Sequence, residues 1–137
     1  MSVKISGKYI GNKKTSFVHE LSGTEIITAA PLDNQGDGSS FSPTDLTAAS
    51  LAACMMTIIG IVSERDGFDI SGTSVDVEKH MATEAPRRIS QIVVNFKLPK
   101  HLTTEQRAHV EKAAYTCPVH KSLATEVNVP VTFNYVL

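Results

Sequence analysis

The sequence predicts an α+β fold with the element order βββ-α-ββ-α-β. Short apolar–polar alternations occur near both ends of the chain, and a long apolar run with helix-start signals separates them. A second segment with helix-capping signals follows the later alternations. The 137 residues contain no internal repeat and no linker, so we expect a single domain spanning residues 1–137.

The composition excludes several classes of protein. An apolar fraction of 42% and a charged fraction of 20% are typical of soluble globular proteins, and a net charge of −1 argues against nucleic acid or an anionic membrane as a partner. No apolar leader is present, and the apolar run 46–62 is shorter than a membrane span. We therefore expect a cytoplasmic protein with no nucleic-acid or membrane partner. In a reducing compartment its two cysteines are free or redox-active rather than a structural disulfide.

The first forty residues are predicted to form three antiparallel strands. The alternations cover residues 4–10, 16–21 and 25–29. Gly11-Asn12 and Ser22-Gly23 are turn signals that separate them. A polar, glycine-rich loop at residues 31–40 then ends the pattern.

A long helix is predicted to begin at Ser42. Ser42 suits the N-cap, Pro43 the first helical position and Asp45 the acidic position of a capping box. The run LTAASLAACMMTIIGIV that follows is apolar on nearly every face, and Gly67 supplies the stop. A small domain cannot easily cover such a helix alone, so we expect a homodimer in which two of these helices pack together.

The remaining elements are two strands, a helix and a last strand. Strands are expected at residues 71–80 and 89–98, with Pro86 in the loop between them. A Thr-x-x-Gln pattern at 103–106 starts the second helix, which Pro118 interrupts before a short turn that runs to about residue 124. The strand 127–136 closes the chain, and Pro130 places it near a sheet edge.

The two cysteines have different surroundings. Cys54 lies within the apolar run, where burial raises a thiol pKa, and by itself it is typical of a small core residue. Cys117 precedes Pro118, so we expect it at an N-cap, where backbone N–H groups favour a thiolate. His120 and Lys121 can add positive charge there. A metal site of Cys54, Cys117 and His120 is a weaker hypothesis because structural zinc requires four ligands, so we expect no metal.

Two segments carry a resemblance to a known family. SPTDLTAASLAACM and CPVHKSL resemble the two cysteine motifs of the OsmC/Ohr family, the osmotically inducible and organic hydroperoxide resistance proteins. The resemblance implies an intertwined homodimer with a long central buried helix and active sites at the subunit interface. It implies reduction of organic hydroperoxides, and possibly hydrogen peroxide, with Cys54 as the peroxidatic and Cys117 as the resolving cysteine. It also implies a redox-active disulfide, a lipoylated or thioredoxin-like dithiol reductant and no cofactor.

One departure from the family pattern leaves alternatives open. Family peroxidases hold the thiolate with an Arg from the N-terminal sheet, paired with a Glu at the start of the central helix, whereas this chain has no Arg before Arg65. Asp45 is then either a capping acid or an orienting partner in the site. The first candidates for the cation are Arg87 and Arg88, from the next hairpin or the other subunit. The further candidates are Lys13, Lys14 and Lys121.

The missing Arg favours a second hypothesis beside the enzyme. In it, the same dimeric fold binds a small apolar ligand at the subunit interface, and its thiols are reactive but not catalytic. The metal-site protein is the third hypothesis.

Overall fold

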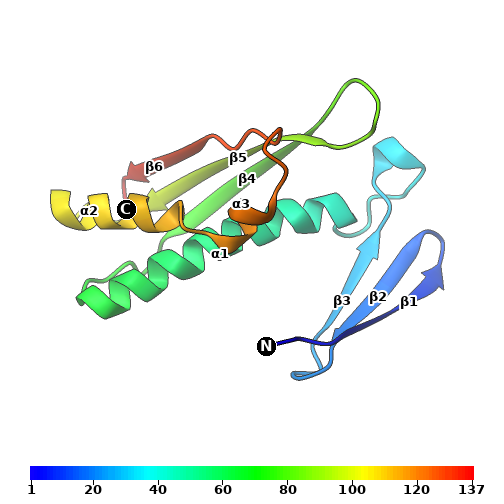
Figure 1. Ribbon diagram of the computed structural model, residues 1–137, viewed down its shortest axis with the longest axis horizontal. Helices are drawn as coiled ribbons and strands as arrows, with labels where there is room; N and C mark the ends of the chain where they lie inside the picture. Colours follow the sequence, from blue (N-terminus) through cyan, green and yellow to red (C-terminus); the bar gives the residue numbers. More distant parts are fainter. The chain divides into compact units, whose positions relative to one another are not determined.

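The computed structural model describes residues 1–137, the whole sequence, in two compact units, Met1–Thr47 and Ala48–Leu137. The element order confirms the α+β prediction (Figure 1). The expected short turn after Pro118 is the helix α3 (Pro118–Ser122), and the short helix η1 (Leu32–Asn34) is an addition. That the two units act as a single domain stays a prediction.

The first unit contains an antiparallel sheet of order β1-β2-β3, as predicted. Its strands are β1 (Ile5–Gly11), β2 (Lys14–His19) and β3 (Glu25–Ala29). Asn12 and Lys13 both have positive φ, 54° and 59°, which is the geometry of a tight hairpin turn that matches strand twist. The second strand therefore begins at Lys14 and ends at His19, two residues earlier than predicted at each end.

One face of this sheet is apolar and exposed in the single chain. Gly7 pairs with Phe17, and a Cβ on Gly7 would lie 2.2 Å from the Phe17 ring, so glycine is required where the ring crosses the strand. The other large side chains of this face are Ile5, Tyr9 and Ile26, which are 63%, 69% and 46% exposed. Such a surface on a three-stranded sheet is typical of an interaction face.

Helix α1 (Pro43–Asp66) begins and ends as predicted. The Ser42 Oγ accepts the Asp45 N–H at 3.1 Å, and the Asp45 carboxylate accepts the Ser42 N–H at 2.9 Å, which completes a capping box. At the other end, Gly67 has φ +75° and the Phe68 N–H donates to the Ser63 carbonyl at 3.0 Å. This bond closes the last turn as a Schellman motif.

The length of α1 corrects one expectation. The helix has 24 residues and its most apolar window has a mean hydropathy of 2.0, so by length and composition it could cross a membrane. The expectation that the apolar run is too short to span a bilayer is therefore wrong. A single helix of this kind is weak evidence for insertion, because core helices of soluble proteins have the same properties and 39% of this window is buried within the chain.

The second unit contains the sheet β4-β5-β6, formed by β4 (Ser74–Met81), β5 (Ile89–Leu98) and β6 (Val131–Tyr135). β4 pairs antiparallel with β5, and β6 is a parallel edge strand, as Pro130 predicted. β4 starts three residues later than predicted, because Asp69 accepts the Ser71 N–H and Gly72, at φ +85°, continues the turn. β6 is likewise shorter, and Asn128 before it makes only an isolated bridge.

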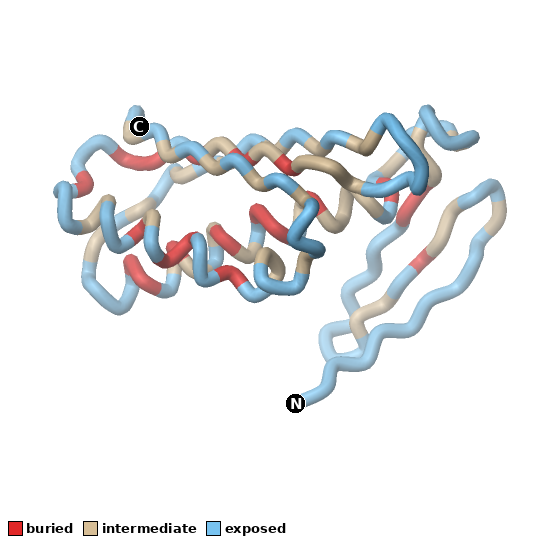
Figure 2. Tube along the Cα trace, turned by 45° about the horizontal axis from the view of Figure 1, so that its top comes forward, coloured by how far each residue is buried: buried red, intermediate tan, exposed pale blue.

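The core lies between this sheet and two helices on one of its faces, α1 and α2 (Thr104–Ala114) (Figures 1 and 2). Alternate side chains of β5 are fully buried, as the pattern predicted, and Phe96 stacks on Phe133 with ring centroids 5.5 Å apart. The buried cluster is Ala48, Leu51, Ala52, Met55, Ile59, Ile92, Val94, Phe96, Leu98, Leu102, Val110, Ala114 and Cys117.

Polar contacts fix α2 against β6. Arg107 donates to the carbonyls of Leu102 and Lys100 at 2.9 and 2.8 Å and lies 4.3 Å from the Tyr135 ring centroid. The Tyr135 hydroxyl donates to the Glu111 carboxylate at 3.0 Å. Burial is the larger cause and this hydrogen bond the second cause of the raised pKa of Tyr135. Because Cys117 follows α2 directly, this clamp also sets the position of the cysteine.

The N-cap of α2 provides a first prediction. Thr103 accepts the Gln106 N–H at 3.1 Å, and the Gln106 side chain accepts the Thr103 N–H at 2.9 Å. Thr103→Ala should lower the free energy of unfolding by about 1 kcal/mol, measured by urea denaturation. Thr104→Ala, in the next position and also exposed, is the matched control and should change it far less. Equal losses in the two variants would contradict the capping assignment.

Candidate functional site

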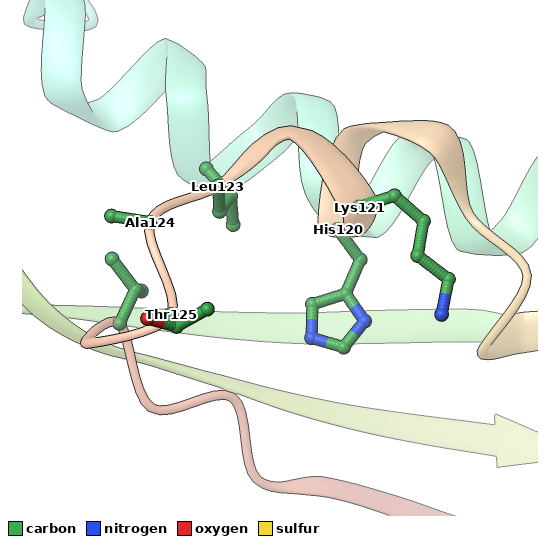
Figure 3. Close-up of a pocket in the computed structure, with 6 residues that line it drawn as sticks. His120, Lys121, Leu123, Ala124 and Thr125 are labelled. Atoms are coloured by element: carbon green, nitrogen blue, oxygen red, sulfur yellow. The ribbon is translucent and has the colours of Figure 1, made fainter.

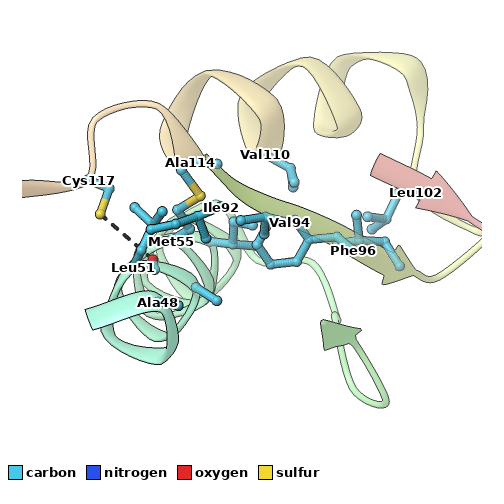
Figure 4. Close-up of a cluster of buried hydrophobic side chains, with 13 residues drawn as sticks. Ala48, Leu51, Met55, Ile92, Val94, Phe96, Leu102, Val110, Ala114 and Cys117 are labelled. Carbon is cyan, nitrogen blue, oxygen red and sulfur yellow. Dashed lines mark hydrogen bonds between the residues drawn. The ribbon is translucent and has the colours of Figure 1, made fainter. Parts of the chain in front are cut away.

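Cys117 lies in the tight turn between α2 and α3, where Pro118 occupies the first helical position. It is the N-cap of α3, as predicted, and its Sγ accepts the His120 N–H at 3.4 Å. The side chain is fully buried. On the other side of the sulfur, the Leu51 carbonyl oxygen of α1 lies 3.9 Å away, at the outer limit of a thiol hydrogen bond (Figure 4).

Cys54 lies on α1, one helical turn after Leu51, and it packs against the buried cluster while remaining half-buried. Its thiol lies close enough to the Cys117 thiol to raise the pKa of Cys117. The fold therefore brings the two cysteines together from distant parts of the sequence. Both are free thiols in this structure.

The pKa of Cys117 reflects these neighbours. Burial first, and the neighbouring Cys54 thiol second, raise the pKa of Cys117 above its ordinary value of 9.0. The backbone N–H groups of His120 and Val119 act in the opposite direction. At neutral pH Cys117 is therefore a thiol, and it holds its proton beside the sulfur of Cys54.

In this arrangement Cys54 can act as a nucleophile, and Cys117 is the second thiol that can react with it. A small molecule can reach the half-buried Cys54, whereas Cys117 is shielded from solvent. An oxidised Cys54 would have a thiol already in contact with it, and such a thiol traps a sulfenic acid before further oxidation. The N–H groups of α3 can stabilise negative charge on the Cys117 sulfur when the pair exchanges.

Several of the predicted supporting residues have other partners in the structure. Asp45 forms the capping box of α1 with Ser42, which is the first of the two roles considered for it. Arg88 is held on its own hairpin, where its guanidinium lies 2.7 Å from the Glu84 carboxylate and donates to the Pro86 carbonyl. Lys14 pairs with Asp37 at 3.2 Å. No basic side chain is among the groups that shift the pKa of Cys117. Of the remaining candidates, Arg87 lies in the same hairpin as Arg88 and Lys13 lies in the first hairpin turn.

Lys121 and His120 line a separate pocket of about 330 Å³ beside α3 (Figure 3). The His120 Nδ1 is buried without a hydrogen-bond partner, and the hydrogen bond from His120 to the Cys117 sulfur comes from the backbone N–H. The ring therefore does not join the two sulfurs in a ligand set. No group of three potential metal ligands occurs in the chain, all of which the structure describes.

Two contributors to the site were missed from the sequence. The Leu51 carbonyl and the Val119 N–H are backbone groups, and side-chain patterns contain no signal for them. The position of Pro118 after Cys117 does indicate that N–H groups of the next turn point back toward the sulfur.

Comparisons with known proteins identify a family and several solved structures that this chain resembles. A family model described as OsmC-like protein matches residues 36–132. A search of curated proteins finds no match. A solved structure from Psychrobacter arcticus 273-4, provisionally assigned to the osmotic stress and detoxification response, is 42% identical with a TM-score of 0.88, and the match covers 98% of this chain and 96% of that one.

More distant structures share the fold. The organic hydroperoxide resistance protein OsmC of Legionella pneumophila is 17% identical with a TM-score of 0.75, over 98% of this chain and 97% of that one. The organic hydroperoxide resistance protein OhrB of Bacillus subtilis is 17% identical with a TM-score of 0.71, over 98% of each chain.

The raised pKa of Cys117 predicts a loss of stability at alkaline pH. In the unfolded chain this thiol ionises near 9.0, whereas the folded protein retains the proton to higher pH and so binds more protons in that window. The free energy of unfolding of the reduced protein should therefore fall as the pH rises above 9.0. Urea denaturation from about pH 8 to about pH 10 measures this fall.

Two variants isolate the contribution of the buried thiol. Cys117→Ser should remove its part of the alkaline decline, because a hydroxyl does not ionise in this range. Cys54→Ser should retain a smaller decline, since burial still acts on Cys117. Parallel curves for wild type and Cys117→Ser would show that the folded state does not hold the proton more tightly.

Proposed function

Because this chain belongs to the OsmC-like protein family, we propose that it is a thiol peroxidase that reduces organic hydroperoxides with Cys54 and Cys117. The contact between the two cysteine side chains, one half-buried and one buried, carries this proposal. The names of the Legionella and Bacillus proteins, which share the fold, support the same class of substrate.

In the first step the Cys54 thiolate attacks the terminal oxygen of the hydroperoxide. The O–O bond breaks, Cys54 becomes a sulfenic acid, and the alkoxide takes a proton and leaves as the alcohol. A half-buried position among apolar side chains favours an organic hydroperoxide, because the apolar part of the substrate can remain out of water.

In the second step the Cys117 sulfur attacks the Cys54 sulfenic acid. The S–O bond breaks, water leaves with the proton of Cys117, and a Cys54–Cys117 disulfide forms. Because the two side chains are already close together, the sulfurs need to move little for this step. An external dithiol, either a lipoylated or a thioredoxin-like protein, then reduces the disulfide by two thiol exchanges and becomes the oxidised partner.

We propose that the enzyme is a homodimer and that the second subunit supplies the cation missing beside Cys54. Two surfaces support this proposal separately: the apolar face of the first sheet, and an exposed strip of α1 formed by Ala53, Thr57 and Ile61. Ile61 alone is 59% exposed. Small side chains on such a strip allow close approach of another helix.

The reaction also favours a reducing compartment. The catalytic cycle requires both cysteines as thiols and a dithiol partner to restore them, so we propose that the protein works in the cytoplasm without a cofactor.

Hydroperoxide consumption with a dithiol reductant tests the proposed reaction. The wild type should turn over cumene hydroperoxide, and Cys54→Ser should reduce the rate to background. Without the reductant, Cys117→Ser should consume one equivalent of hydroperoxide and then accumulate oxidised Cys54, because no second thiol resolves it. If Cys54→Ser retained turnover, Cys54 would not be the peroxidatic residue. If the wild type bound cumene hydroperoxide without consuming it, the protein would instead be a ligand-binding member of the family.

Sedimentation tests the homodimer. The wild type should sediment as a dimer at micromolar concentration. Thr57→Arg should shift the population toward monomer, because a charged side chain on the exposed strip would have to be buried in the helix contact. Lys97→Arg, on the solvent-exposed part of β5, is the control and should remain dimeric. A wild-type monomer would contradict this part of the proposal.

A further inference from the structure

The pocket beside α3 has no part in the proposed reaction. Its volume is about 330 Å³, and Figure 3 shows the side chains of His120 and Lys121 leaving α3 on the same side. The remaining lining residues are Leu123, Ala124, Thr125 and Val127, so no carboxylate belongs to its wall. The pocket therefore combines two nitrogen-bearing side chains with apolar ones. Its volume is at the lower end of the range for ligand sites, which suits a small molecule.

Hydrogen bonds to Cys117 fix the backbone from which the two nitrogen-bearing side chains project. The His120 N–H donates to the Cys117 Sγ at 3.4 Å, and the Lys121 N–H donates to the Cys117 carbonyl at 3.1 Å. Cys117 is itself fully buried. This turn is therefore ordered before any ligand binds, and such order lowers the entropic cost of binding.

The ring of His120 offers a hydrogen-bond donor to the pocket. Its Nδ1 is buried without a partner, and because the ring as a whole is only half-buried, its accessible edge carries Nε2. A buried N–H without an acceptor is rarer than a buried acceptor without a donor. In the neutral ring the proton is therefore on Nε2, and this N–H can donate to a ligand.

From these groups we propose that the pocket binds a small organic monocarboxylate with a short, branched apolar tail. The carboxylate accepts hydrogen bonds from the His120 Nε2–H and the Lys121 ammonium. The side chains of Leu123, Ala124 and Val127 cover the tail. One ammonium with no carboxylate beside it matches a monoanion, and the apolar side chains favour an organic anion over inorganic phosphate. This inference is independent of the proposed peroxidase function.

Nitrogen NMR of the histidine side chains tests the site in the reduced protein. We expect 3-methylbutanoate to shift the His120 ring resonances, with a Kd of about 1 mM for so small a ligand. The neutral 3-methylbutanamide has the same shape and should bind much more weakly, and so should inorganic phosphate. The His120 resonances are identified by their loss in His120→Phe.

Two variants with matched controls test the two binding groups, with the backbone amide of Thr125 as the reporter. Lys121→Gln should weaken 3-methylbutanoate binding about fivefold, because an ion pair is lost. His120→Phe retains a ring and the backbone N–H but loses the donor, and should also weaken binding about fivefold. The controls Lys97→Gln and His101→Phe make the same changes at exposed positions elsewhere and should leave the affinity unchanged.

Three outcomes would overturn the inference. Equal binding of the carboxylate and its amide would show that the pocket does not recognise the charge. Phosphate binding as tightly as 3-methylbutanoate would show that the apolar side chains do not select an organic anion. No shift of the His120 ring or the Thr125 amide with any of the three probes would show that the pocket holds only water. None of these results bears on the reactions of the cysteine pair.

Discussion

The proximity of the Cys54 and Cys117 side chains is the feature on which the proposed chemistry depends. It holds a protonated thiol against a half-buried sulfur, and the N–H groups of α3 face the same buried sulfur. Each part of the second unit contributes to it. The buried cluster fixes the position of α1 against β5, and the Arg107–Tyr135 contact fixes α2. As a result, Cys117 lies beside Leu51, one helical turn before Cys54.

The same helix explains why a single chain leaves so much apolar surface exposed. An α-helix that is apolar on nearly every face can bury only one side against a three-stranded sheet and α2. The other side of α1 keeps Ile61 exposed, and the first sheet has an apolar face of its own. A second copy of the chain is the simplest partner for these surfaces, and we propose that it also supplies the cation beside Cys54.

Local signals in the sequence were sufficient for the architecture. Ser42 with Asp45, Thr103 with Gln106, and Gly67 identified the helix ends, because capping is an interaction between near neighbours. Strand ends were less accurate where side chains and turns compete with the ladder, as with Asp69 and Ser71 before β4. The possibility of a membrane span was missed because only the apolar run 46–62 was counted, whereas the helix continues to Asp66.

The site was only partly predictable. Pro118 placed Cys117 at an N-cap, and the family resemblance paired it with Cys54, but neither could show that Leu51 and Val119 contribute backbone groups. The partners of the charged side chains could not be predicted from local sequence patterns either. Arg88 and Lys14 were reasonable candidates for the cation, yet the fold pairs them with Glu84 and Asp37.

The most direct test of the cysteine pair is peptide mapping after reaction with one equivalent of cumene hydroperoxide. The account predicts a rapid loss of two thiols per chain and a single Cys54–Cys117 linkage within the same chain. Slow oxidation of the two cysteines independently, without that linkage, would contradict it.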